Sequence, residues 1–146
     1  GTMVQRFDVG ARISEMAVHN NTVYLAGQVA KDPSQDIRGQ TRQVLASIDA
    51  LLERAGSDKS RILMAQIFLG DLKDFAAMNE VYKQYFKPPM PTRSCVAVAA
   101  LVHRCDDRTV EALAGLAGEC LMDGGVEWLI GLAVHLQAEL RARRLE

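Results

Sequence analysis

The sequence predicts one small domain that contains both β-strands and α-helices, because strand-like and helix-like segments alternate along it. A segment rich in β-branched and aromatic residues, 22–30, predicts a strand, and a helical segment, 36–56, follows it. The same order returns in the apolar strand 62–69 and the amphipathic helix 71–86. A further apolar run over residues 96–102 comes next.

The first helix is predicted from its periodicity and from a glycine at its end. Asp36 leads into it, and Gly56 follows its last apolar residues, as is typical of helix C-termini. The apolar residues at helical spacing are Val44, Leu45, Ile48, Leu51 and Leu52.

The second helix has a capping residue at its start, which we expect to be Asp71 or Asp74. The proline-rich segment 87–91 ends the helix, because proline cannot continue it. The buried stripe is expected to comprise Phe75, Met78, Val81, Tyr82 and Tyr85.

The segment after this helix, Pro91-Thr92-Arg93-Ser94-Cys95-Val96, predicts an anion-binding point. Arginine keeps its charge at physiological pH and grips a carboxylate through two parallel hydrogen bonds. A simpler interpretation makes Arg93 a surface arginine and Cys95 a small buried hydrophobe. Gly27, in the first strand, marks a place where another backbone or a ligand approaches closely.

The order of these motifs resembles the RidA family, also called the YjgF or L-PSP endoribonuclease-like family, over roughly positions 11 to 101. Each motif is weak alone, but their shared order and spacing are specific. The matching landmarks are Ala26-Gly27-Gln28, Gln40-Thr41-Arg42, Leu52 through Ser57, Ile67 to Asp71, Asp74 to Asn79 with Tyr82 behind it, and Pro91 to Val96.

The resemblance implies an α+β fold of the chorismate-mutase-like kind, in which a sheet carries two helices on one face. It also implies a homotrimer, with active sites in clefts between neighbouring subunits. A single subunit is therefore expected to hold only part of each site.

The activity that the resemblance implies is hydrolysis of reactive enamines and imines, such as 2-aminoacrylate, to 2-keto acids and ammonia. Carried over by position, Arg93 binds the substrate carboxylate, the backbone around Gly27 and Cys95 orients it, and Asn79 lies near the cleft. Glu111, matching a glutamate of the family's final strand, is the candidate for sharing a proton with the attacking water. Its alternative is an ordinary surface acid.

Two departures from the family pattern are visible. Ile13 stands where family deaminases carry a tyrosine, which makes the chain more similar to the YoaB-like branch. Residues 112–146 are rich in helix formers, so we predict a RidA/YjgF-like domain over 1–111 and a helical C-terminal extension over 112–146. Its second half, Val126 to Arg144, predicts an amphipathic helix that packs on its own trimer, or else binds a partner or a membrane surface.

Composition narrows the choice of partners. The 17 basic and 18 acidic residues are nearly balanced, which gives no electrostatic footprint for nucleic acid, and no apolar run is long enough to span a membrane. The three cysteines lack zinc-ligand spacing, so reduced thiols in a cytoplasmic protein are expected. No metal site and no cofactor fingerprint is found.

Three classes of function follow. The first is hydrolytic imine deamination. The second is a non-catalytic or regulatory trimer that binds small carboxylates, such as 2-keto acids, without turnover. The third is the ribonuclease or translation-inhibitor activity attached to some family members, which the low aromatic content of 5% and the absence of a basic stripe do not support.

Overall fold

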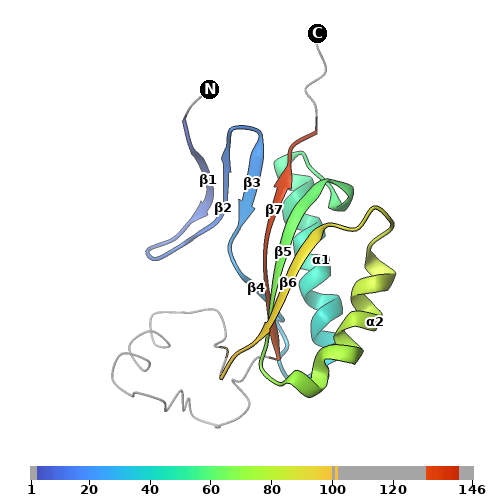
Figure 1. Ribbon diagram of the computed structural model, residues 1–146. Coiled ribbons are helices and arrows are strands. Elements are labelled where there is room, and N and C mark those ends of the chain that lie inside the picture. The colour runs from blue at the N-terminus through green and yellow to red at the C-terminus, as the bar shows by residue number, and fades with distance from the viewer. Residues whose placement is uncertain (1–2, 100, 102–130, 142–146) are drawn as a thin grey trace.

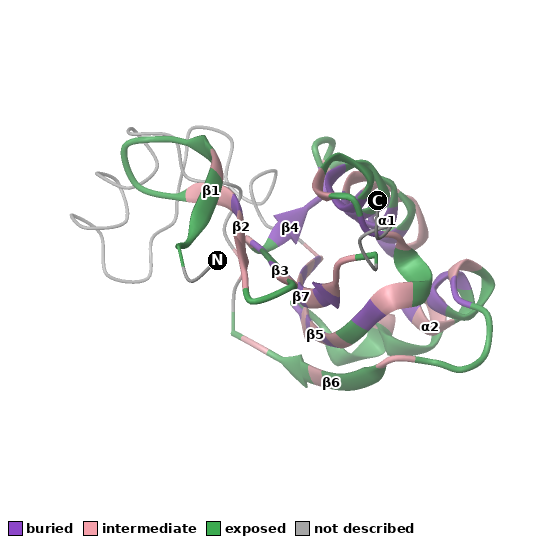
Figure 2. Cartoon of the chain, turned by 90° about the horizontal axis from the view of Figure 1, so that it is seen from above, coloured by how far each residue is buried: buried purple, intermediate pink, exposed green. Residues whose placement is uncertain are grey.

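The computed structural model describes residues 3–99, 101 and 131–141. Within them one seven-stranded sheet carries both long helices on the same face (Figures 1 and 2). This arrangement confirms the predicted α+β fold. The helices are α1, Ile37–Ala55, and α2, Phe75–Tyr85, and the strands are β1, Gln5–Val9; β2, Ser14–His19; β3, Thr22–Leu25; β4, Gln28–Val29; β5, Ile62–Leu69; β6, Thr92–Ala97; and β7, Leu132–Glu139.

The strand order is β1-β2-β3-β7-β5-β6, with the short β4 also paired to β7. The pairs are antiparallel except for β5 and β6, which run parallel. Parallel neighbours need a crossover connection, and α2 supplies it. The β5-α2-β6 unit therefore places α2 over the outer strands of the sheet (Figure 1).

The first predicted helix is confirmed, together with both of its end signals. Asp36 accepts a hydrogen bond from the Gly39 backbone N–H at 2.8 Å and so caps the start. Gly56 adopts a left-handed conformation with φ of 79° at the end, where a side chain would be strained. The predicted apolar stripe packs into the core: Val44, Leu45, Ile48, Leu51 and Leu52 are all buried.

The second helix begins at Phe75, later than predicted. Asp71 instead caps a 3-10 turn, Leu72–Asp74, by accepting from the Lys73 backbone N–H at 2.9 Å. Asp74 stands at the N-cap of α2 but makes no capping hydrogen bond through its side chain. Phe75, expected in the buried stripe, is 38% exposed, because it faces the pocket described below.

The helix predicted from Val126 to Arg144 is wrong for residues 132–139, which form β7 in the middle of the sheet. Its buried residues recur at every second position, the period of a strand. They are Leu132, Val134, Leu136 and Ala138. The predicted domain boundary between residues 111 and 112 lies outside the described residues.

Hydrogen bonds hold both ends of β7. At the start, the side-chain oxygen of Gln40 accepts from the Gly131 backbone N–H at 2.9 Å, while the Gln40 amide donates to two loop carbonyls. At the other end, the Ser57 hydroxyl donates to the Glu139 carbonyl at 2.6 Å and Arg61 donates to the Leu140 carbonyl at 3.0 Å. The strand is thus anchored to α1 at its start and to the segment that follows α1 at its end.

Replacing Leu136 with alanine should lower the free energy of unfolding by about 2–5 kcal/mol, because the side chain is only 2% exposed and its loss leaves a cavity. Leu63→Ala on β5 is the matched control, since Leu63 is 45% exposed and should cost about 0.5 kcal/mol or less. Urea unfolding at one fixed protein concentration measures both values. Equal effects would contradict a buried β7.

Candidate functional site

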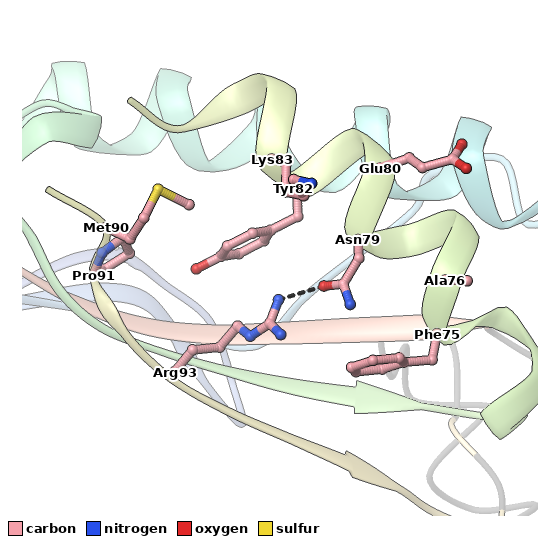
Figure 3. A pocket seen from close by; sticks show the side chains of 9 residues that line it. All are labelled: Phe75, Ala76, Asn79, Glu80, Tyr82, Lys83, Met90, Pro91 and Arg93. Carbon is pink, nitrogen blue, oxygen red and sulfur yellow. Dashed lines mark hydrogen bonds between the residues drawn. The ribbon is translucent and has the colours of Figure 1, made fainter. Parts of the chain in front are cut away.

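Arg93 lies on β6, opposite Ala65 of β5 in the parallel register. Ala65 is buried against the helices, so the side chain of Arg93 leaves the sheet on the helix-covered face. There it meets α2, which the crossover between β5 and β6 has placed above it (Figure 3). The sequence thus positions the arginine through the topology of one βαβ unit.

Three side chains of α2 surround the guanidinium. The side-chain oxygen of Asn79 accepts a hydrogen bond from it at 2.5 Å. The rings of Tyr82 and Phe75 lie 4.8 and 5.9 Å from its central carbon, within the range of cation–π attraction. These residues are spaced four and three apart, so they share one face of the helix.

The guanidinium of Arg93 forms no ion pair among the described residues, in contrast to four other arginines. Its hydrogen-bond partner Asn79 is neutral, so the positive charge is oriented without being neutralised. Glu80, the acid nearest in the helix, is instead paired with Arg38 at 2.8 Å. The arrangement suits an incoming anion, and a planar carboxylate above all.

A pocket of about 540 Å³ opens beside Arg93, between α2 and the start of β6 (Figure 3). Its size suits a small organic ligand. Most of the lining is apolar or aromatic, with Arg93, Asn79 and Lys83 as its nitrogen-bearing side chains. The lining residues are Phe75, Ala76, Asn79, Glu80, Tyr82, Lys83, Met90, Pro91 and Arg93.

Cys95 lies two residues beyond Arg93 on β6, and therefore on the same face of the sheet. Burial raises the pKa of its thiol, and the nearby positive charge of Arg93 opposes that rise. At neutral pH the side chain is accordingly a protonated thiol. A protonated thiol does not favour a nucleophilic role for Cys95.

Gly27 lies between β3 and β4, on the other side of β7 and β5 from β6. Three interstrand spacings separate it from Arg93, a distance of about 14 Å. One subunit therefore brings Arg93, Asn79 and Cys95 together but leaves Gly27 apart. A side-chain carbon built at Gly27 would meet nothing within 4 Å, so its surroundings are open. Glu111 lies outside the described residues.

Tyr82 and Phe75 are pocket residues that the sequence interpretation assigned only to the buried stripe of the helix. The signal that could have found them is their spacing from Asn79, which puts all three over one point of the neighbouring strand. Ile13, in the place of the family tyrosine, is exposed in the turn between β1 and β2.

Within the described ranges, no group of three or more His, Cys, Asp or Glu residues could hold a metal ion. No helix of the described part is long and apolar enough to cross a membrane.

A sheet that carries two helices on one face, with the charged side chain of Arg93 beside a pocket at the β5-α2-β6 crossover, defines a small α+β protein. The family model described as "Endoribonuclease L-PSP" matches residues 3–114. The chain therefore belongs to this family, the RidA/YjgF family of the predicted resemblance.

Named relatives agree with that membership. The "RutC family protein YoaB" of Escherichia coli is 42% identical over 100 residues, which cover 68% of this chain and 87% of that protein. A goat protein named "2-iminobutanoate/2-iminopropanoate deaminase" is 37% identical over 94 residues, covering 60% of this chain and 69% of its own. The likeness to YoaB confirms the predicted similarity to that branch.

A solved structure shows the same fold. NMB1025 from Neisseria meningitidis, a member of the YjgF protein family, superposes with a TM-score of 0.76 at 27% identity. The match covers 97% of this chain and 98% of that one.

The opposing effects of burial and of Arg93 on the pKa of Cys95 give a prediction. Arg93→Gln removes the charge that lowers the thiol pKa while keeping much of the side chain, so the pKa of Cys95 should rise further. The pH dependence of iodoacetamide labelling, followed on the Cys95 peptide by mass spectrometry, measures it. Arg93→Lys keeps the charge and should leave the profile near that of the wild type. A lower pKa in Arg93→Gln would contradict this electrostatic account.

Proposed function

We propose that the protein hydrolyses reactive enamines and imines of the 2-aminoacrylate type to 2-keto acids and ammonia. The observation that carries the proposal is the guanidinium of Arg93, oriented by neutral Asn79 and unpaired with any carboxylate of the described residues, beside a pocket of about 540 Å³. Membership of a family in which one relative is named an imine deaminase supports it.

The proposed reaction requires the protein mainly to position the substrate and a water molecule. Arg93 holds the substrate carboxylate, and we call this contact the carboxylate clamp. It fixes the adjacent imine carbon in the pocket. An enamine such as 2-aminoacrylate first becomes the imine as a proton moves from its nitrogen to carbon 3. Water adds to the imine carbon, both protons of the water pass in turn to the nitrogen, and the C–N bond breaks as the C=O bond forms. The products are a 2-keto acid and ammonia, and neither a metal nor a cofactor enters the proposed scheme.

Glu111 is proposed as the group that takes the proton from water and returns one to the leaving nitrogen. Cys95 and the backbone near Gly27 are proposed to orient the substrate. Because Gly27 and Arg93 are about 14 Å apart in one subunit, we propose that the complete cleft forms between subunits of a homotrimer in the cytoplasm.

Arg93→Ala should reduce the acceleration of keto acid release from 2-aminoacrylate about a hundredfold, because a charged, two-point contact to the substrate is lost. A dehydratase generates the substrate in situ, and product is measured against spontaneous hydrolysis. Arg54→Ala is the control, since Arg54 pairs with Asp8 and lies outside the pocket lining. Glu111→Gln should also lose acceleration.

The alternative is a trimer that binds small carboxylates without turnover. Wild-type protein that binds 2-oxobutanoate but does not accelerate hydrolysis would support that alternative. Acceleration that survives in Arg93→Ala would contradict the carboxylate clamp itself.

Asn79→Asp gives an independent prediction. A carboxylate at this position would pair with the Arg93 guanidinium in place of the amide oxygen and compete with the substrate. We expect affinity for 2-oxobutanoate to fall at least tenfold at pH 7 and to recover partly below the pKa of the new aspartate. Calorimetric titration at the two pH values measures both effects. Unchanged affinity at pH 7 would show that Asn79 does not orient the clamp.

A further inference from the structure

The hydroxyl of Tyr82 is buried without a hydrogen-bond partner. The residue is only 5% exposed, and its hydroxyl is the one buried side-chain polar atom of the described residues that makes no hydrogen bond. Leaving such a group unpaired destabilises the folded protein, so unpaired polar atoms in native structures call for an explanation.

Other buried polar side chains of the described residues show that the fold otherwise pairs such groups. Buried Gln28, Gln40, Thr41 and Ser57 each make hydrogen bonds. Tyr85, three residues further along α2, donates its hydroxyl to Asp49. The exception at Tyr82 falls on a residue that lines the pocket and touches Arg93.

The position of the Tyr82 ring decides what its hydroxyl can reach. The ring extends from α2 towards β6 and lies 4.8 Å from the central carbon of the Arg93 guanidinium (Figure 3). Burial raises the pKa of Tyr82, so the phenol is neutral and able to donate a proton at physiological pH. Met90, which also lines the pocket, is 44% exposed and has a flexible side chain that can yield to a ligand.

We propose that Tyr82 is a specificity-determining residue whose hydroxyl donates a hydrogen bond to the 2-oxo or 2-imino group of a substrate held by Arg93. The proposal rests on the proposed function, because it needs the carboxylate at Arg93. A donor beside the clamp distinguishes 2-oxo and 2-imino acids, which carry an acceptor next to the carboxylate, from simple carboxylic acids, which do not.

The test compares two ligands that differ only in that acceptor, 2-oxobutanoate and butanoate, by calorimetric titration of the full-length protein. Wild type should bind 2-oxobutanoate more tightly. Tyr82→Phe should lower the affinity for 2-oxobutanoate about five- to tenfold and leave the affinity for butanoate unchanged, which removes the preference. If Tyr82→Phe lowers the affinity for both ligands to the same degree, or for neither, the proposal is overturned.

Two controls separate this inference from a folding defect and from the proposed function. Tyr85→Phe removes a hydroxyl from the same helix outside the pocket lining and should not change the preference. Tyr82→Phe should have a melting temperature no lower than wild type, because it removes an unpaired polar group. If Arg93→Ala abolishes butanoate binding, the carboxylate clamp is retained. If Tyr82→Phe then still prefers 2-oxobutanoate, the role of Tyr82 is refuted and the clamp is not.

Discussion

The pairing of β7 with both β3 and β5 is the interaction on which the rest of the fold depends. In the described residues, β7 is the strand that joins the antiparallel β1-β2-β3 unit to the parallel β5-β6 pair. Its buried alternate residues also supply the floor on which α1 packs. Without this strand the two parts of the sheet would share no backbone ladder.

The geometry of the candidate site depends on that central strand. Because β7 fixes β5, and β5 fixes the parallel β6, the face of α2 that carries Asn79 comes to lie above Arg93. The pocket residues themselves come from one short stretch, Phe75 to Arg93. Local sequence therefore supplies the chemistry, and the long-range pairing holds the strand under the helix.

Local patterns were sufficient where one signal dominated. Asp36 and Gly56 marked the ends of α1 correctly, because capping depends on residues close in sequence. The sequence of segment 132–139 wrongly predicts a helix, because its Leu, Ala, Gln and Glu residues favour helices when taken alone. The alternation of buried residues was present but short, and tertiary pairing overrode the helical propensity.

The site could be predicted only as far as sequence position carried it. Arg93 and Asn79 were both anticipated, and they meet in one hydrogen bond. That Tyr82 would be both buried and unpaired could not be deduced, since the environment of a hydroxyl depends on packing in three dimensions. The separation of Gly27 from Arg93 also follows from strand order, which no local pattern encodes.

The central position of β7 also has a consequence for how the protein is made. Its residues leave the ribosome after those of β3 and β5. Until then, β3 and β5 each have an unpaired edge, and in the folded protein these edges pair with β7 inside the sheet. Exposed apolar edges of this kind favour pairing between chains. Production of this protein is therefore expected to depend on chaperone capacity until the strand that closes the sheet emerges.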